Sequence, residues 1–524
     1  MQLSAAVLLA LLALASCARE ADLRPNVLLI SLDSVRRDML GCYGASFGGR
    51  SPSPNLDRLA AEGVRIEDAL SSTSWTLPAH ATLFTGRPEL VHGLEQDGQR
   101  LGDSFPTLAE RLRADGYRTA GVYSGPYLDP RFGLGRGFER YRAGYGPELA
   151  AAAESARAAL ARVHALGGST SRAQGHAAIE DNARAEHALE VASHRDSSSR
   201  TVTELALAEL AADDERPFFL FAHYFDAHFD YLPPPPFDQE LDPGYAGNAD
   251  GRDFVRRLAA PETSANDIEH LRALHAGELA WIDSEIGRVL AELERRGLAE
   301  NTLVIVVADH GDEFLEHGGL GHRRTLYEEV VRVPVLLRWP AGLPAGETCS
   351  GPVGLAAVAP SVLALVAGKP ERAALLVPAA GEPVLGRLVL SPTGERATVR
   401  VLESFRRGAL KLLRERSLDP SRTEMLRWID LALHPGEPAQ GWSTDFTDVR
   451  AREALAAFRT EHARLARERR EPPRAEKAED LLAAFRGLGY AGEEARVGAL
   501  SGEILVLPPD VLPPDKGTLE RAGE

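Results

Sequence analysis

The pattern of hydrophobic and polar residues predicts buried strands that alternate with amphipathic helices. The strands are apolar runs ending in polar residues, and they lie at 25–33, 217–224, 302–310 and 333–338. Runs without polar alternation are typical of parallel strands that are covered on both faces. Residues 267–296 repeat apolar positions at helical spacing and predict a long helix. The chain is therefore expected to form an α/β domain with a large, mostly parallel sheet flanked by helices.

Shorter elements fill the intervals between these strands. A helix is expected from Ser53, because serine is a good N-cap and Pro54 suits the first helical turn. Further expected elements are helices at 105–116 and 201–212 and a strand at 117–123.

Changes in composition divide the chain. The main domain is expected at 24–385, with an Ala-rich insertion at 144–200. Beyond it the apolar runs become short and alternating, which predicts a small α+β subdomain at 386–490. The last residues, 491–524, contain two Pro-Pro pairs and are expected to be a loose tail. Helices expected in the subdomain lie at 451–467 and 475–488.

The N-terminus resembles an export signal. Residues 1–17 form a short apolar run, and its end, Leu-Ala-Ser-Cys17, resembles a bacterial lipobox. We therefore expect a periplasmic or outer-membrane-anchored lipoprotein, with an ordinary cleaved signal peptide as the alternative, since the run is not preceded by Lys or Arg. No other segment is apolar for long enough to span a bilayer. The only membrane contact expected is through this lipid anchor.

Composition narrows the class of function. The chain has 524 residues and a net charge of −17, and it lacks a long basic patch, so no nucleic-acid partner is expected. The negative charge still permits an anionic substrate, because bound metal ions can invert the local field. Apart from Cys17, the chain has Cys42 and Cys349, for which a disulfide is permitted but unsupported. No Cys/His spacing resembles a zinc finger.

Potential metal ligands follow several of the predicted strands. Because parallel strands bring their carboxyl ends to one edge of a sheet, these side chains are expected to lie near one another. Carboxylate together with imidazole suits zinc or manganese. The candidate ligands are Asp33, Asp226, His228, Asp309, His310 and His322.

Each candidate has a plainer alternative. Asp33 could cap a helix starting at Ser34, and Asp226 and His228 could be surface-loop residues. His322 could be exposed beside Arg323. One shared site explains all of these residues together, which is a simpler explanation than a separate alternative for each.

A hydroxyl-rich stretch at 72–87 supplies a candidate nucleophile. Pro78 and the small residues after it predict a helix over 79–84, so Thr76 lies just ahead of a helix N-terminus. That position favours an anionic substrate, because free N–H groups and the positive end of the helix dipole meet there. Thr76 is therefore the candidate attacking group if a bound cation lowers the pKa of its hydroxyl. The alternative is that Thr76 only caps the helix.

Several motifs together carry a family resemblance. They read P-N-V-L-L-I-S-L-D from Pro25, S-P-N-L-D-R-L-A-A-E-G-V from Ser53, T-L-P-A-H-A-T-L-F-T-G-R from Thr76, G-Y-R-T-A-G from Gly116, L-V-I-V-V-A-D-H-G-D from Leu303 and T-L-Y-E-E-V-V-R-V-P-V-L-L-R-W-P from Thr325. With them, the chain resembles the sulfatase family of the alkaline phosphatase superfamily over about residues 24–490. The resemblance implies an alkaline phosphatase-like fold and ester hydrolysis.

The chain departs from the family pattern at the site itself. Thr76 stands where sulfatases carry the Cys or Ser that becomes formylglycine, and a threonine could be oxidised only to a ketone. His80 replaces the motif's Arg, Ser34 replaces a second Asp, and residues 122–124 replace a Lys-x-His. His310 replaces a frequent Asn. By resemblance, each change points to the superfamily's Thr-nucleophile phosphodiesterases and phosphoethanolamine transferases.

That resemblance implies one or two divalent ions, zinc, manganese or calcium. The implied ligands of the first ion are Asp33, Thr76, Asp309 and His310. Candidates for a second ion, or for holding the substrate oxyanion, are Asp226, His228 and His322.

The expected function is hydrolysis of a sulfate or phosphate ester, with phosphoester cleavage favoured. The resemblance implies attack by Thr76, contact of Arg323 with a non-bridging oxygen, and a role for His80 in orienting or protonating, unless His80 only packs against the helix. The substrate is expected to be a small-molecule, glycan or lipid ester. The alternatives are a phosphoethanolamine-type transferase and an inactive envelope- or glycan-binding relative.

Overall fold

The structure is a computed structural model of the chain. It describes residues 24–96, 98–146, 197–252, 263–375, 383–390, 399–417 and 424–473, and isolated positions between 149 and 184. The expected export signal, most of the expected Ala-rich insertion, the helix expected at 475–488 and the expected C-terminal tail lie outside the described residues.

An eight-stranded sheet forms the centre of the molecule, in the order β10-β2-β9-β6-β1-β5-β3-β4. Every neighbouring pair is parallel except the two pairs made by β9, which confirms the expected mostly parallel sheet. The strands are β1 (Asn26–Leu32), β2 (Val64–Leu70), β3 (Arg118–Tyr123), β4 (Arg140–Ala143), β5 (Phe218–Tyr224), β6 (Thr302–Ala308), β9 (Arg332–Arg338) and β10 (Glu347–Gly354). Strands β2, β4 and β10 were not predicted, because polar residues interrupt their sequences.

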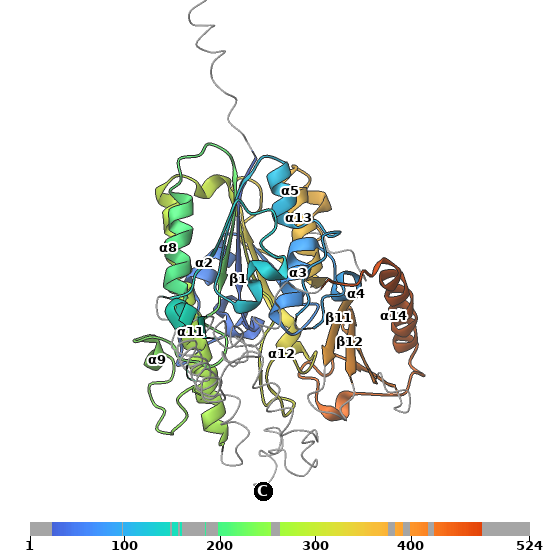
Figure 1. The fold of residues 1–524 in the computed structure, drawn as a ribbon. Helices are drawn as coiled ribbons and strands as arrows, with labels where there is room; N and C mark the ends of the chain where they lie inside the picture. Colours follow the sequence, from blue (N-terminus) through green and yellow to red (C-terminus); the bar gives the residue numbers. More distant parts are fainter. Residues whose placement is uncertain are drawn as a thin grey trace, which may run out of the picture.

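Helices cover both faces of this sheet (Figure 1). One face carries α2 (Pro54–Ala61), α8 (Ser199–Leu210) and α11 (Ala265–Arg295), and the other carries α3 (Thr76–Thr85), α5 (Leu108–Ala114) and α13 (Val358–Val366). Further α-helices among the described residues are α4 (Glu89–His92), α9 (Phe237–Glu240), α12 (Glu328–Val331) and α14 (Val449–Glu468). Short 3-10 helices occur at Arg37–Met39, Gly41–Tyr43, Pro126–Leu128, Pro130–Phe132, Ala299–Asn301, Leu355–Ala357, Pro370–Arg372 and Ala439–Gly441.

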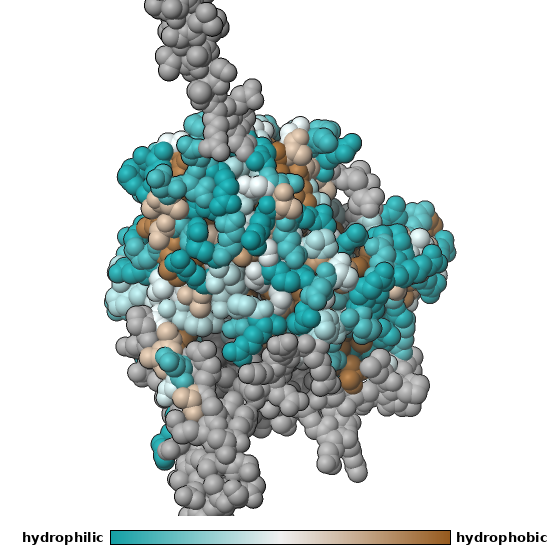
Figure 2. Space-filling view, turned by 45° about the horizontal axis from the view of Figure 1, so that its top comes forward, coloured by the Kyte–Doolittle hydropathy of each residue, from teal (hydrophilic) through white to brown (hydrophobic). Residues whose placement is uncertain are grey.

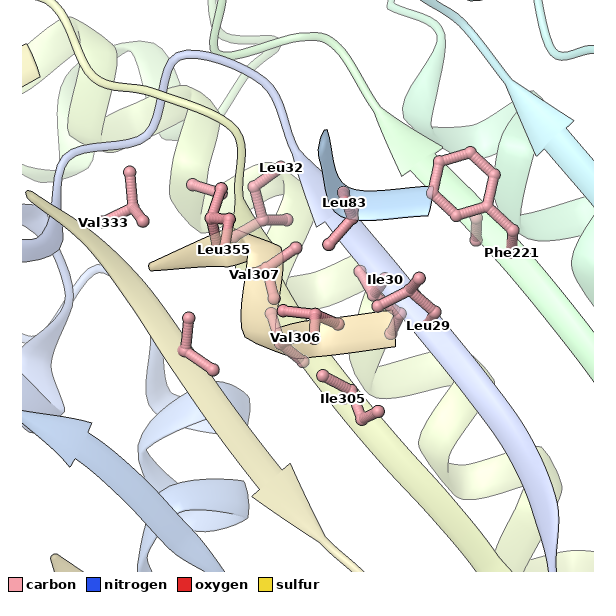
Figure 3. Packing of buried hydrophobic residues seen from close by; sticks show 14 of the residues in the cluster. Leu29, Ile30, Leu32, Leu83, Phe221, Ile305, Val306, Val307, Val333 and Leu355 are labelled. Carbon is pink, nitrogen blue, oxygen red and sulfur yellow. The ribbon is translucent and has the colours of Figure 1, made fainter. Parts of the chain in front are cut away.

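The main hydrophobic core lies against the central strands. Ile30 of β1, Val306 of β6 and Leu83 of α3 are completely buried and pack in one cluster (Figure 3). Strand β1 pairs with β5 on one side and β6 on the other, with Leu32 opposite both Tyr224 and Ala308. This register brings the carboxyl ends of the three strands level with one another.

A four-stranded antiparallel sheet follows the main domain. Its strands, in spatial and chain order, are β11 (Val384–Leu390), β12 (Arg400–Arg407), β13 (Leu410–Ser417) and β14 (Met425–Asp430). Helix α14 packs on it, with Phe458 against Phe405 at 5.7 Å between ring centroids. The buried Lys411 of β13 joins this sheet to the main domain, because its ammonium lies 3.0 Å from Glu328 Oε1 of α12 and 2.9 Å from Glu437 Oε1.

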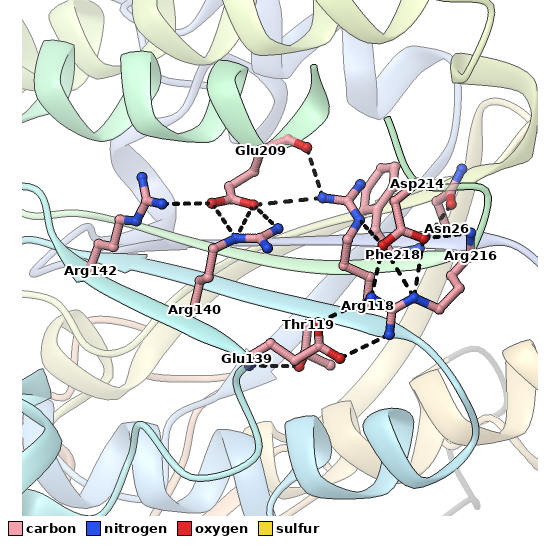
Figure 4. Close-up of polar contacts among 10 residues, drawn as sticks. All are labelled: Asn26, Arg118, Thr119, Glu139, Arg140, Arg142, Glu209, Asp214, Arg216 and Phe218. Atoms are coloured by element: carbon pink, nitrogen blue, oxygen red, sulfur yellow. Dashed lines mark hydrogen bonds and ion pairs between the residues drawn. The ribbon is translucent and has the colours of Figure 1, made fainter. Parts of the chain in front are cut away.

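A charged network fixes the β3–β4 edge of the large sheet to α8 (Figure 4). Buried Glu209 of α8 faces the guanidinium groups of Arg118, Arg140 and Arg142. Its shortest contact, to Arg140, is 2.6 Å. These pairs hold the C-terminal end of α8 against the sheet edge, near Phe218 at the start of β5.

Among the described residues, none of the helices combines the length and apolar character that crossing a bilayer requires. The face in Figure 2 is mostly hydrophilic, and its hydrophobic residues form small, separate groups.

Candidate active site

The candidate site lies where β1, β5 and β6 end and α3 begins. Asp33 follows β1, His223 lies near the end of β5, and Asp309 and His310 follow β6. Thr76 is the first residue of α3. All five side chains are buried. Those of the two aspartates and the two histidines come from the ends of neighbouring parallel strands. The sequence predicted this position for Asp33, Asp309 and His310.

Thr76 lies at the centre of this group. Its Oγ1 is 3.3 Å from Asp33 Oδ2 and 3.4 Å from His310 Nε2. The helix starts three residues earlier than predicted, and its N-cap is Trp75, which makes no side-chain capping bond. The alternative that Thr76 caps the helix is therefore wrong. Its hydroxyl instead faces the acidic end of the sheet.

The carboxylates of Asp33 and Asp309 lie close together beside this hydroxyl, with one ligand oxygen of each within 4.8 Å of the other. Asp309 Oδ1 accepts hydrogen bonds from the backbone N–H groups of Ser34 and His310, whereas Oδ2 receives none from the described residues. Burial and the neighbouring Asp33 raise the pKa of Asp309 well above its ordinary value. Burial also acts to raise the pKa of Asp33, but contact with His223 lowers it below the ordinary range. The pair calls for a bound cation.

His310 presents a nitrogen suited to binding that cation. Its Nδ1 lies 3.2 Å from the carbonyl oxygen of Gly311, which can only accept, so Nδ1 carries the hydrogen and Nε2 the lone pair. Burial, with His322 nearby, lowers the pKa of His310 to about 3, so the ring is neutral at pH 7. A ring fixed by a backbone carbonyl is the usual arrangement of a metal-binding histidine.

The residues at this point fit a divalent metal. One ligand atom from each of Asp33, Asp309 and His310 lies within 4.8 Å of the others, and Thr76 adds a hydroxyl oxygen. Three oxygen donors and one imidazole nitrogen suit zinc or manganese. The alternative that Asp33 caps a helix is wrong, because Ser34 adopts a positive φ of 57° and no helix begins there.

His223 was not predicted to belong to the site. Its Nε2 lies 3.2 Å from Asp33 Oδ2, and its Nδ1 accepts a hydrogen bond of 3.2 Å from the N–H of Gly125. The hydrogen is therefore on Nε2, and the ring orients Asp33 rather than serving as a ligand. A Cβ at Gly125 would lie only 2.8 Å from the ring, so glycine permits this approach. The available signal was a histidine within an otherwise apolar strand.

His228 and His322 form a second group beside Thr76, with ring centroids 5.0 Å apart. His322 Nδ1 donates to Asp312 Oδ1 at 2.7 Å, and Asp312 Oδ2 accepts from the Tyr231 hydroxyl at 2.7 Å. His228 Nδ1 donates to the carbonyl of Phe229 at 2.6 Å. In the neutral form of each ring, Nε2 is thus the unprotonated nitrogen. Asp312 and Tyr231 were missed, since only the fold brings them to His322.

A pocket opens in front of Thr76. Its walls are largely aromatic, and Arg323 and the two histidines supply the polar groups. The guanidinium of Arg323 lies 4.0 Å above the ring of Trp75, and its Nη1 donates to Tyr127 Oη at 3.3 Å. Arg323 is thereby held in the pocket wall, where an anionic group would meet it. The lining residues are Trp75, Thr76, Pro126, Tyr127, Phe225, His228, Phe229, His322 and Arg323.

Two candidate residues, Asp226 and His80, belong neither to this pocket nor to the metal group. The carboxylate of Asp226 is occupied by the start of α8, where it accepts from Ser198 N at 2.8 Å and Ser199 N at 3.0 Å, and by Trp281 Nε1 at 3.0 Å. Asp226 is thus not brought to the metal group, because these donors already satisfy it. His80 is completely buried behind Thr76.

His80 contacts the backbone of α3 rather than the pocket. Its Nδ1 donates to the carbonyl of Thr76 at 2.9 Å, and its Nε2 accepts from Ser31 Oγ at 2.9 Å. Nδ1 is also 3.7 Å from Asp309 Oδ2. Burial lowers the pKa of His80 to about 3, so the ring is neutral. The side chain therefore fixes the first turn of α3 and the position of Thr76.

A family model described as Sulfatase matches residues 25–368, which is most of the chain. The chain belongs to the sulfatase family. The predicted family is thereby confirmed, and in this sulfatase-family chain the matched region contains every site residue described above.

Named relatives are 28% identical to this sulfatase-family chain over the aligned residues. Mouse (Mus musculus) steryl-sulfatase is 28% identical over 420 residues, covering 65% of this chain and 62% of the relative. The multifunctional alkaline phosphatase superfamily protein PehA of Trinickia caryophylli is 28% identical over 357 residues, covering 60% and 68%. The chain thus spans less than two thirds of the length of the mouse relative.

A solved structure supports the fold. The phosphonate monoester hydrolase of Agrobacterium radiobacter superposes with a TM-score of 0.59 at 20% identity, covering 84% of this chain and 96% of that one. At this identity the likeness concerns the fold alone, which is alkaline phosphatase-like as predicted.

Proposed function

We propose that this sulfatase-family protein is a metal-dependent ester hydrolase that uses the unmodified hydroxyl of Thr76 as its nucleophile. The observation that carries the proposal is the position of Thr76 Oγ1, within 3.4 Å of both Asp33 and His310 and in front of a pocket. The names of the relatives, sulfatases and a multifunctional phosphatase-superfamily protein, support hydrolysis of sulfate or phosphate esters in general.

Phosphate esters are the favoured substrates. A sulfatase that releases sulfate through formylglycine needs a Cys or Ser at the nucleophile position, and this chain has threonine there. The methyl group on Cβ of Thr76 prevents formation of an aldehyde. An unmodified alkoxide must instead attack the ester directly, forming a covalent ester of Thr76 that water then cleaves.

Each residue has a distinct part in this reaction. Asp33, Asp309 and His310 would hold a divalent ion with Thr76, and the ion would supply the charge that lowers the pKa of the hydroxyl and stabilises the transferred group. Asp33 accepts the hydrogen bond from Thr76 Oγ1, and His223 keeps Asp33 oriented.

The pocket residues complete the reaction. Arg323 is positioned to bind a non-bridging oxygen of the ester, where a cation stabilises developing charge. His322, oriented by the carboxylate of Asp312, presents Nε2 as an acceptor for a proton of the attacking water in the second step. Burial, with His322 nearby, lowers the pKa of His228 to about 4, so this ring also acts as a neutral hydrogen-bond partner.

The pocket walls suggest the kind of alcohol that leaves. Trp75, Tyr127, Phe225 and Phe229 offer aromatic faces beside Thr76. Such walls suit an aromatic or apolar leaving group on a small-molecule or glycan ester better than a highly charged one.

The test is a panel of aryl esters offered to the zinc- or manganese-loaded protein: a phosphate monoester, a phosphate diester, a phosphonate and a sulfate. We expect phosphoesters to be cleaved faster than the sulfate. We also expect Thr76→Ala to lower kcat by at least about a thousandfold. Thr76→Ser, which keeps a hydroxyl, should retain measurable turnover.

Thr85→Ala is the matched control, because Thr85 ends the same helix and its hydroxyl contacts backbone groups, donating to the carbonyl of Ala81 and accepting from the N–H of Arg87. Its rates should equal those of the wild type. Sulfate cleavage that exceeds every phosphoester rate and survives Thr76→Ala would overturn the proposal.

A further inference from the structure

A second group of metal-ligand side chains lies outside the candidate active site. Glu313 begins the short hairpin of β7 (Glu313–Phe314) and β8 (Leu320–Gly321), His317 lies in its turn, and Glu329 belongs to α12. One ligand atom from each of the three side chains lies within 4.8 Å of the others. None of the three takes part in the reaction described above.

The hydrogen-bond partners of His317 fix which of its nitrogens carries the hydrogen. Nε2 lies 3.2 Å from the carbonyl oxygen of Glu437, which can only accept, so Nε2 is the donor. Nδ1 faces a carboxylate oxygen of Glu329. In a neutral ring the lone pair of Nδ1 would point at another lone pair. This contact therefore requires a cation between the two groups, either a proton or a metal ion.

Glu313 distinguishes between these two cations. Its side chain is 1% exposed, and its Oε2 receives no hydrogen bond from the described residues, although Oε1 accepts from Thr325. A single proton on His317 offsets only one of the two carboxylates. A divalent ion offsets both and gives Glu313 a partner.

We propose that Glu313, His317 and Glu329 bind a divalent transition-metal ion, zinc or manganese, at a site separate from the catalytic metal group. One imidazole with two carboxylates suits these ions. The ring of His317 is held for this task by the carbonyl of Glu437 and by Tyr327, which stacks on it at 3.7 Å between centroids.

The backbone supports the same assignment. A Cβ on Gly319 would lie 2.2 Å from Glu313 Oε2, so glycine at this position leaves the space around the carboxylate open. The role of the ion is structural. The ion would tie the start and the turn of the hairpin to α12. The same hairpin leads directly to His322 and Arg323 in the pocket wall.

The first experiment counts metal. The wild-type protein and His317→Gln are purified, loaded with zinc, dialysed and analysed by inductively coupled plasma mass spectrometry. We expect His317→Gln to contain one equivalent less than the wild type. His270→Gln is the matched control, because His270 also pairs with a carboxylate, Asp242 at 2.9 Å, and stacks on a tyrosine, Tyr245 at 3.6 Å. Its metal content should equal that of the wild type.

The second experiment uses the unaltered chain and so does not depend on the variant folding. Anomalous difference maps of wild-type crystals at the zinc or manganese edge should contain a peak between Glu313, His317 and Glu329. Equal metal content in wild type and His317→Gln, or a map without that peak, overturns the proposal. Neither result bears on the proposed reaction, because loss of Thr76-dependent turnover is measured separately.

Discussion

Replacing Asp309 by Asn should have opposite effects on stability with and without metal. Asp33 and Asp309 are buried, and their nearest ligand oxygens lie within 4.8 Å of each other. At that separation and an effective dielectric constant of about 20, two like charges repel by about 3 kcal/mol. Asn keeps an oxygen for the two backbone donors that Asp309 Oδ1 accepts but removes the charge. In the metal-free protein the substitution should therefore stabilise the fold by about 1–3 kcal/mol.

With metal bound, the wild type should be more stable than the Asp309→Asn variant. An ion bound at a thousand times its dissociation constant stabilises the native state by about 4 kcal/mol, and the Asn variant loses one of the ligands that produce this gain. In excess zinc the wild type should thus unfold at the higher temperature, and in excess chelator the variant should. The assay is thermal unfolding of both proteins in zinc and in chelator.

Asp283→Asn is the control for this comparison. Asp283 is also buried, but its carboxylate accepts from the backbone of Asn55 and Leu56 and belongs to none of the groups that could hold a metal among the described residues. Its effect should be equal in zinc and in chelator. If Asp309→Asn lowers the unfolding temperature by the same amount in both solutions, the two carboxylates do not repel each other in the metal-free state, and the reasoning is refuted.

Other predictions concern a histidine that contacts a metal ligand, a buried glutamate, and a buried lysine between the two sheets. His223→Gln should weaken zinc binding by about 10–100-fold, because it removes the ring that orients a ligand, and a chelator competition assay measures this. Burial raises the pKa of Glu89 to about 8, so the folded state holds a proton that the unfolded state loses above pH 4.5. The free energy of unfolding should therefore fall from pH 5 to pH 8, with a loss on the order of 3 kcal/mol at pH 7. In urea unfolding, Glu89→Gln should remove this pH dependence. Lys411→Met should cost about 3–5 kcal/mol in the same assay, because it leaves Glu328 and Glu437 buried without their cation.

Each of these has a contrary result. Unchanged zinc affinity in His223→Gln would mean that Asp33 needs no such contact. Equal pH slopes in wild type and Glu89→Gln would show that Glu89 titrates normally. A stable Lys411→Met would imply that water or other groups reach its two carboxylates.

Local patterns were sufficient for the framework of the molecule. Strands such as β1, β5 and β6 are continuous apolar runs, so their burial and their parallel arrangement follow from composition over a few residues. Strand β2 was missed, because its polar residues at positions of intermediate burial make it look like a loop. The start of α3 was misplaced, since Trp75, rather than a capping hydroxyl, precedes the helix.

Contacts between residues far apart in the sequence decided which of the candidate side chains lie together in the site. The sequence by itself determined that Asp33, Asp309 and His310 stand at strand ends and that Thr76 stands at a helix start, because strand and helix ends follow from local periodicity. Only the tertiary structure decided that α8 occupies Asp226 and that His223 reaches Asp33. Both contacts are made between segments far apart along the chain, so packing between those segments determines which donors reach each carboxylate.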